Sequence, residues 1–169
     1  QIHQPQEMAE VEQARYRFVY QEFLALQLAL ALRRWSLSHD RQAAQLPASE
    51  KIHRRILDRF PFQLTTPQER VIAEISSDMA LQVPMNRLLQ GDVGSGKTVV
   101  AEYAMLLAVA HGYQAVLMAP TEILVMQHLR TLQQDLAESQ VRIATLTGSL
   151  SQADRRQTLA ALREGEIDL

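Results

Sequence analysis

The octapeptide Gly91-Asp92-Val93-Gly94-Ser95-Gly96-Lys97-Thr98 has the pattern of a Walker A loop, in which a glycine and four further residues precede Gly-Lys-Thr. The backbone N–H groups of such a loop, and the start of the helix that follows, converge on a polyphosphate. The lysine neutralises phosphate charge and the threonine hydroxyl binds Mg²⁺. A Cβ atom would block the tight turn, so glycines are needed. The sequence therefore predicts a phosphate-binding loop in which Lys97 and Thr98 carry the chemistry.

The residues around the loop agree with this interpretation. Upstream, Arg87-Leu88-Leu89-Gln90 predicts a short buried strand. Downstream, Val99 to Ala110 is an apolar run of helical length that stops at Gly112. Strand, glycine-rich loop and helix follow one another in the order that phosphate binding requires.

Composition narrows the class of protein. The chain has 169 residues, of which 47% are apolar, which is enough for one ordinary domain with an appendage. It has no cysteine, so a disulfide framework and a thiolate metal site are excluded and a reducing cytoplasm is expected. No apolar run reaches membrane-spanning length, and we expect a soluble protein with no membrane partner.

Charge is distributed unevenly along the chain. The formal net charge is −2, but residues 1 to 60 carry nine Lys and Arg against seven Asp and Glu, and the remainder carries eight against twelve. The basic excess is concentrated in Lys51, Arg54, Arg55 and Arg59. A solvated helix face explains such a run more often than contact with DNA does, and both interpretations stay open.

The first part of the chain predicts helices. Residues 7 to 35 contain neither Gly nor Pro and are rich in strong helix formers, so one long helix is expected. Residues 36 to 50 predict a polar connector broken by Pro47, and residues 51 to 60 a second helix. We place a domain boundary near Phe60-Pro61, which divides a helical connector (1–60) from the domain that contains the loop (61–169).

From residue 61 onward helices and strands alternate, which predicts an α/β domain with a mainly parallel sheet. Thr66-Pro67 predicts a helix start, with Thr66 as N-cap and Glu69 at the capping-box position. Ser151 predicts the N-cap of a helix that Gly165 ends. The expected helices are 66 to 81, 99 to 110, 121 to 138 and 151 to 163, and the further strands are 115 to 119, 141 to 146 and a beginning at 167 to 169. A strand that has barely begun predicts a fragment of a longer protein.

Three segments together resemble the RecG family of bacterial ATP-dependent DNA helicases, in superfamily 2. They are Phe62 to Gln68, Pro84 to Thr98, and Met118 to Leu124 followed by Gln127-His128. The resemblance covers residues 61 to 165 and implies a P-loop RecA-like lobe, with motif I at 91 to 98. The upstream helix is similar to the connector that joins the wedge domain to the motor in that family.

The resemblance also implies binding roles. Phe62, Leu64 and Gln68 match the element that contacts adenine in such motors, although Gln68 could instead be an exposed helix-start residue. Motif Ia of the family, a contact to the DNA backbone, matches Pro120, Thr121 and Glu122, and a further contact matches Thr147, Gly148 and Ser149. An ordinary N-cap and an ordinary turn are the alternatives at these two places, and for motif Ia both can hold. We assign no chemical role to Asp92 or His128.

As a whole, the resemblance implies a monomeric helicase that uses ATP and Mg²⁺ to remodel stalled forks and branch-migrate Holliday junctions in DNA repair and recombination. It implies a bacterial cytoplasmic protein at the nucleoid, with a single-stranded-DNA-binding protein as a candidate partner. Two alternatives stay open: the motor of a transcription-repair coupling translocase, and a nucleotide-binding interaction module without turnover.

Two catalytic features of the family have no counterpart in the sequence. There is no Asp-Glu dipeptide for an acidic motif II and no second lobe to supply an arginine finger. We therefore expect a lobe truncated before motif II, which alone binds nucleotide weakly and hydrolyses essentially none.

Overall fold

The computed structural model describes residues 7–39 and 42–169 of the chain. The chain divides after Ala43 into two compact units. The second unit therefore includes residues 44 to 60 together with the Walker loop and the helices that follow it. The functional division predicted near Phe60-Pro61 is a different boundary and stays a prediction.

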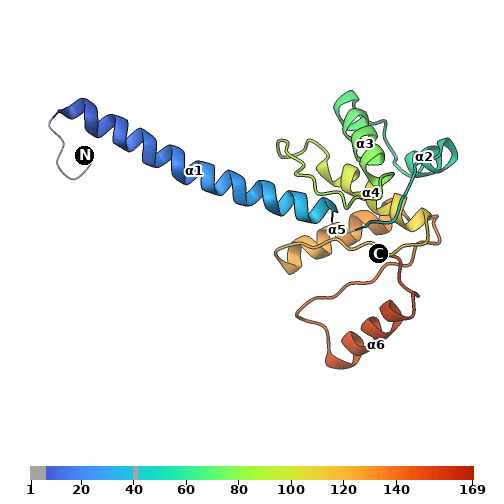
Figure 1. Cartoon of the computed structure of the whole chain (residues 1–169). Coiled ribbons are helices and arrows are strands. Elements are labelled where there is room, and N and C mark those ends of the chain that lie inside the picture. The colour runs from blue at the N-terminus through green and yellow to red at the C-terminus, as the bar shows by residue number, and fades with distance from the viewer. Residues whose placement is uncertain (1–6, 40–41) are drawn as a thin grey trace. The chain divides into compact units, whose positions relative to one another are not determined.

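The first unit consists of helix α1 (Met8–His39), drawn as one continuous helix in Figure 1. This confirms the long helix expected from the absence of Gly and Pro. The helix continues past residue 35, so the predicted polar connector begins later than expected; residues 40 and 41 of it lie outside the described residues. Large apolar side chains on α1, such as Phe23, Leu28 and Leu32, are exposed. None of the helices in the described part of the chain is long and apolar enough to cross a membrane.

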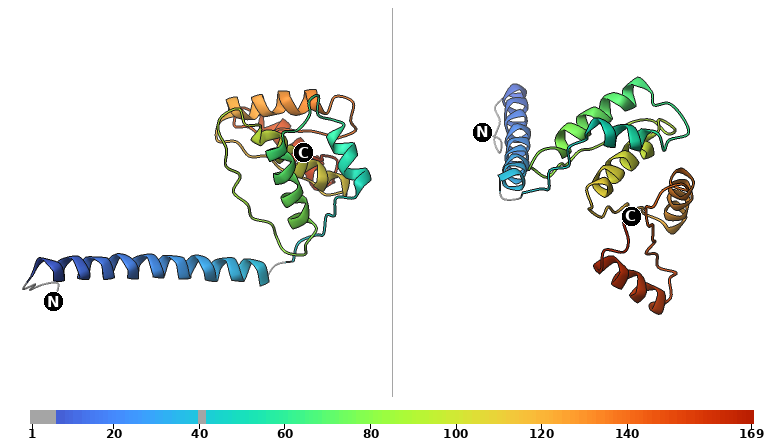
Figure 2. Two further views of the ribbon diagram at one scale, coloured as in Figure 1. Left: turned by 90° about the horizontal axis from the view of Figure 1, so that it is seen from above. Right: turned by 90° about the vertical axis from the view of Figure 1, so that its right-hand side faces the viewer.

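Five helices make up the regular structure of the second unit in the described residues (Figure 1). Both α2 and α3 pack against α4. Figure 2 shows α6 on the far side of this unit from α3. The helices are α2 (Glu50–Leu57), α3 (Thr66–Met79), α4 (Lys97–Ala110), α5 (Glu122–Asp135) and α6 (Gln152–Arg163).

Most helix ends lie where cap residues predict them. The Ser151 hydroxyl accepts a hydrogen bond from the N–H of Asp154 at 3.1 Å, as expected for the N-cap of α6. Gly112 and Gly165 follow α4 and α6 with φ of 79° and 74°, a left-handed conformation that favours glycine. These three predictions are confirmed.

The predicted start of α3 is wrong by one residue. Thr65, not Thr66, is the N-cap, and its backbone N–H donates to the Gln68 side chain at 2.9 Å. The capping-box position therefore belongs to Gln68 rather than Glu69. The shift has a functional consequence, because it fixes the side chain of Gln68 at the start of the helix.

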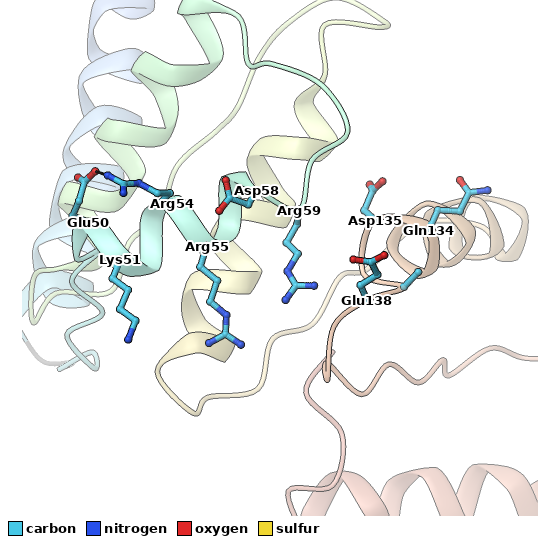
Figure 3. A pocket seen from close by; sticks show the side chains of 10 residues that line it. Glu50, Lys51, Arg54, Arg55, Asp58, Arg59, Gln134, Asp135 and Glu138 are labelled. Carbon is cyan, nitrogen blue, oxygen red and sulfur yellow. Dashed lines mark hydrogen bonds and ion pairs between the residues drawn. The ribbon is translucent and has the colours of Figure 1, made fainter.

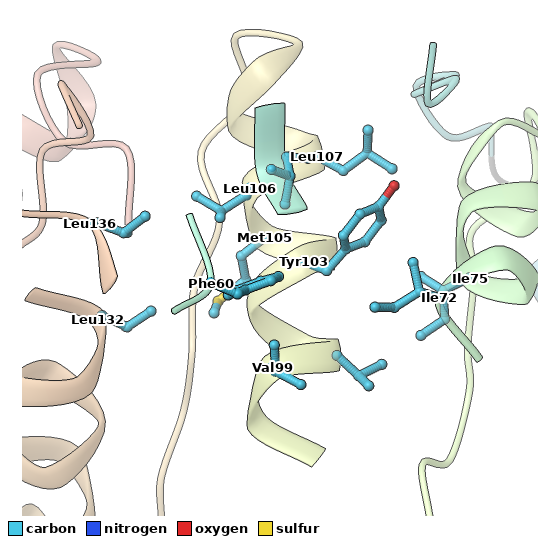
Figure 4. Close-up of a cluster of buried hydrophobic side chains, with 12 residues drawn as sticks. Phe60, Ile72, Ile75, Val99, Tyr103, Met105, Leu106, Leu107, Leu132 and Leu136 are labelled. Carbon is cyan, nitrogen blue, oxygen red and sulfur yellow. The ribbon is translucent and has the colours of Figure 1, made fainter. Parts of the chain in front are cut away.

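The core of the second unit is built around α4, which lies between α3 and α5 (Figure 4). Tyr103 and Leu107 on α4 have no exposed surface. Ile72 and Ile75 of α3 pack on one side of the helix, and Leu132 of α5 with its C-cap residue Leu136 on the other. Burial of each such side chain contributes about 1.5–3 kcal/mol, so α4 is the best-anchored element of this unit.

Residues 44 to 57 are held against this core by hydrogen bonds. The N–H of Leu46 donates to the carbonyl of Met79 at 2.8 Å, and His111 hydrogen-bonds the carbonyl of Pro47 through Nε2 at 3.1 Å. His53 Nδ1 lies 2.7 Å from the buried hydroxyl of Tyr103. Helix α2 is thus bonded directly to α4, the helix that begins at the Walker loop.

The expected sheet is not confirmed, because residues 7–39 and 42–169 contain no β-strand. The segments predicted as strands (87–90, 115–119, 141–146 and 167–169) have no regular secondary structure, and the last three share isolated backbone hydrogen bonds. Ala115 N–H donates to Asp168 O at 2.9 Å, and Asp168 N–H to Arg142 O at 2.8 Å, so the last segment lies between the other two.

The short length of that middle segment explains why no ladder forms. A ladder needs consecutive bonds to its neighbours, and residues 167–169 offer only a few. Apolar side chains of the predicted strands are exposed in the described part of the chain: Leu88 and Val116 are each 82% exposed. Hydrophobic runs in the sequence predict strands here, and the sheet stays a prediction, because strand pairing depends on backbone partners.

Candidate functional site

The Walker loop makes a tight turn immediately before α4. Gly94 and Gly96 have φ of 83° and 77°, and Gly96 is the N-cap of the helix. A Cβ atom on Gly96 would collide with Nε2 of Gln68, so that side chain would have to move. The left-handed backbone at position 96 favours glycine, and the close approach of Gln68 adds to this preference.

Lys97 reaches back over the loop from the first residue of α4. Its ammonium donates to the carbonyls of Gly91 and Asp92 at 2.9 Å and 2.6 Å. These bonds keep the charge beside the turn, and Thr98 follows in the first turn of the helix. The Asp92 contact is made by its backbone carbonyl, which agrees with a loop-shaping residue. The half-buried His128 lies on α5.

Gln68 connects the start of α3 to the loop. Its side-chain oxygen accepts from Thr65 N–H, and its Nε2 donates to the carbonyl of Ser95 at 3.0 Å. The structure therefore brings one of the three residues predicted for adenine into contact with the loop. The other two lie just upstream: Phe62 is exposed and stacks on Phe60 at a centroid distance of 6.0 Å, and Leu64 packs against the core.

An ion-pair cluster that sequence reasoning missed holds the segment before the loop. The guanidinium of Arg87 binds Glu74 at 2.6 Å and also Asp78, both on α3. The Arg87 hydrogen bond lowers the pKa of the Asp78 carboxyl. Acidic residues four apart on α3 give a recognisable sequence signal, because that spacing places them on one helix face. With Gln68, the cluster ties α3 to both sides of the loop.

A second missed residue is Glu102, one turn into α4 and 1% exposed. Burial raises its pKa to about 7, and the nearby Asp135 carboxylate of α5 adds to the rise. Its Oε1 atom has no hydrogen-bond partner. The sequence signal that could have identified Glu102 is its position as the single acidic residue in the apolar run 99–110. A buried carboxyl of this kind is costly to ionise and makes α4 sensitive to pH.

The two segments predicted to contact the DNA backbone lie side by side. Thr121 is the N-cap of α5, and its hydroxyl accepts from the N–H of Leu124. Ser149 donates a hydrogen bond to the Glu122 carboxylate and lies 3.0 Å from the Thr147 hydroxyl. Thr121 therefore has the expected N-cap role. Pro120 directly precedes the cap, and Gly148 lies in the turn between the two hydroxyl residues.

These residues fit a nucleoside triphosphate with Mg²⁺. Gly94 and Gly96 bring no Cβ to the turn, the ammonium of Lys97 lies beside it, and α4 presents its positive N-terminal end. Lys97 would contact the phosphates, and Thr98 would hold the metal. A bound triphosphate would supply a phosphoryl group whose transfer releases free energy for mechanical work.

Comparison with known proteins defines the class. Residues 65–168 match the family model of the DEAD/DEAH box helicases, and the chain belongs to this family.

Within that class the chain is similar to RecG proteins. It is 43% identical over 169 residues to the ATP-dependent DNA helicase RecG of Synechocystis sp., covering 100% of this chain and 20% of the relative. The Bacillus subtilis RecG is also 43% identical, over 99% of this chain and 25% of its own length. The fold matches a structure of RecG bound to a three-way DNA junction with a TM-score of 0.79 and 36% identity, over 97% of this chain and 22% of that one.

These matches confirm the resemblance predicted from the three sequence segments. They also support a RecA-like helicase fold. The chain spans about a fifth to a quarter of the length of the relatives it matches. The chain therefore corresponds to one part of a helicase of this kind.

Proposed function

We propose that this chain supplies the helical connector (1–60) and the first part of the first motor lobe (61–169) of an ATP-dependent double-stranded DNA translocase. The translocase would remodel stalled replication forks and branch-migrate Holliday junctions. The observation that carries the proposal is the loop itself: Lys97 is held over a glycine turn to which Gln68 is hydrogen-bonded. The similarity to RecG over the full chain supports the choice of branched DNA as substrate.

In this proposal each part of the site has a separate task. The loop 91–98 grips the phosphates of ATP, Thr98 holds Mg²⁺, and Gln68 reads adenine with Phe62 and Leu64. The hydrogen bond from Gln68 to Ser95 supports the adenine role of Gln68, because it connects the proposed base-contacting element directly to the phosphate-binding loop. Such coupling would link nucleotide identity to the position of the phosphate cradle.

The proposed DNA contacts are the motif Ia segment (120–122) and the turn at 147–149. Their contact through Glu122 and Ser149 supports a single continuous surface. Hydroxyls and a helix N-terminus suit phosphate oxygens, and phosphate contacts grip any sequence, as a translocating motor needs. We further propose a monomeric protein that works at the bacterial nucleoid, with a single-stranded-DNA-binding protein as a candidate partner.

The experiment is a DNA-stimulated ATPase assay on the complete protein that carries this chain. We expect a three-way junction to stimulate hydrolysis and to be unwound, and Lys97→Ala to abolish both. The matched control is Arg156→Ala, which removes an exposed cation of α6 that belongs to none of the proposed sites. Failure of branched DNA to stimulate the wild-type protein would sink the proposal.

The chain alone provides a second test. Since it carries no Asp-Glu acidic motif, we expect no robust DNA-stimulated hydrolysis from these 169 residues. Rapid ATP hydrolysis by the isolated chain would show that a residue within it activates the attacking water. The expectation that an acidic motif outside these residues is needed would then be wrong.

A further inference from the structure

Three basic side chains on helix α2 and just after its end lie on one side, and none of them belongs to a site proposed above. Lys51 and Arg55 are four residues apart, and Arg59 follows after four more. Figure 3 shows these three side chains pointing in the same direction, into an open groove of about 960 Å³. We call Lys51, Arg55 and Arg59 the α2 basic stripe.

The stripe is available for a ligand. In the described residues none of its three members has an ion-pair partner, whereas their neighbour Arg54 is bonded to Glu50 at 2.8 Å and points to another side. Lys51 and Arg55 are exposed and Arg59 is half-buried. Unpaired cations kept together in this way repel one another unless an anion binds.

We propose that the α2 basic stripe contacts the phosphate backbone of duplex DNA. This inference rests on the proposed function and adds a contact surface to it. Lys51 and Arg55 are about 6 Å apart along α2, and Arg59 lies just past the end of the helix with its side chain pointing the same way, so the charges form a row rather than a single anion site. A row of point charges without a hydrogen-bonding fork or apolar anchor suits a repeated anion such as a phosphate backbone, read without regard to sequence.

The opposite wall of the groove limits the contact to the α2 side. Asp135 and Glu138 at the end of α5 line that wall and would repel phosphate. The backbone would therefore lie along the stripe and away from α5. The helix lies upstream of the helicase family match at residues 65–168, so that match does not include the stripe.

The test is duplex DNA binding by the complete protein, measured by fluorescence anisotropy with a labelled three-way junction over a series of salt concentrations. We expect Lys51→Ala and Arg55→Ala each to lower the slope of log affinity against log salt by about 0.9, and the double variant by about 1.8. The effect should not depend on DNA sequence. Arg54→Ala is the matched control, since it removes an equally exposed cation from the same helix and should leave the slope unchanged.

A variant that is expected to bind DNA more tightly gives a second test, because misfolding would weaken binding rather than strengthen it. Glu138→Gln removes a repulsive charge from the opposite wall and should tighten binding at low salt, about two- to fivefold. If Lys51→Ala and Arg55→Ala retain the slope of Arg54→Ala while the wild-type protein binds the junction, the stripe is a solvated helix face and this inference fails alone. If the wild-type protein neither binds the junction nor is stimulated by it, the proposed function fails as well.

Discussion

Helices α1 and α4 are both rich in apolar residues, yet they differ almost completely in burial. Leu107 of α4 has no exposed surface, whereas Leu28 of α1 is 57% exposed. The difference in burial cannot be predicted from the two helix sequences alone, because each is an apolar run without glycine or proline. Burial is set by neighbours: α2, α3 and α5 contribute to the core around α4, and α1 forms a unit of its own.

The comparison teaches which helix bears the site. Because α4 is fixed by core packing, the glycine turn and Lys97 at its start are held in a defined place. A helix with exposed apolar faces cannot position a phosphate cradle in the same way, since few contacts resist its local motion.

The largest expected effect tests the difference in burial directly. Leu107→Ala should lower the free energy of unfolding by about 2–5 kcal/mol, because it leaves a cavity in the core. The matched change Leu28→Ala on α1 should alter it by less than about 0.5 kcal/mol. Urea denaturation followed by circular dichroism measures both. Equal losses for the two variants would break the comparison.

The second effect concerns the buried charge on α4. The pKa of Glu102 in the folded protein is about 7, against an ordinary value of 4.5. The folded state therefore holds a proton that the unfolded state has lost between these values, so stability is greatest below pH 4.5 for this group and falls as pH rises to 7. The full change is on the order of 3 kcal/mol.

Glu102→Gln should remove this fall and make the protein more stable than wild type at pH 8. Glu22→Gln, on the exposed α1, serves as the control and should leave the pH profile unchanged. The measurement is the midpoint of thermal unfolding between pH 4 and pH 8. A wild-type profile that stays parallel to that of Glu102→Gln would mean that Glu102 is not buried as described.

The third effect sharpens the assignment of the loop at the start of α4. Gly96→Ala and Gly112→Ala both place a side chain at positive φ, at opposite ends of the same helix. Only at Gly96 does the new Cβ meet another atom, Nε2 of Gln68, which would have to release the carbonyl of Ser95. We expect Gly96→Ala to cost about 1 kcal/mol more than Gly112→Ala in urea unfolding.

The nucleotide affinity of the same pair separates function from strain. Gly96→Ala should weaken MgATP binding because the cradle and Gln68 both shift. Gly112→Ala should bind as tightly as wild type, since its Cβ meets nothing within 4 Å. Equal affinities for the two variants would count against Gln68 as a link to the loop.

Local features of the fold could be predicted from sequence because they depend on a few neighbouring residues. The cap at Ser151 and the helix ends at Gly112 and Gly165 follow from backbone chemistry within one turn. The cap of α3 was misplaced by one residue because Gln68 and Glu69 can both fill the capping-box position. The choice between them depends on the loop carbonyl of Ser95, which is distant in sequence.

Tertiary features could not be predicted in the same way. The pairing of Arg87 with Glu74 and Asp78, and the approach of Asp135 to Glu102, require two helices to be placed in space. The predicted strand at 115–119 has the right hydrophobic pattern, but its ladder depends on backbone partners that a single segment cannot specify. For the site, the glycine turn before a helix follows from the sequence pattern, whereas the contact between Glu122 and Ser149 does not.

The central claim is that residues 91–98 bind the phosphates of a nucleotide through Lys97. The most direct measurement is a titration with MgATP of the wild-type protein and Lys97→Ala, alongside a titration with adenosine. A charge-assisted contact contributes about 1.5–3 kcal/mol, so Lys97→Ala should weaken MgATP binding at least about tenfold. Adenosine, which has no phosphate, should bind both proteins equally. An unchanged affinity of Lys97→Ala for MgATP would contradict the account.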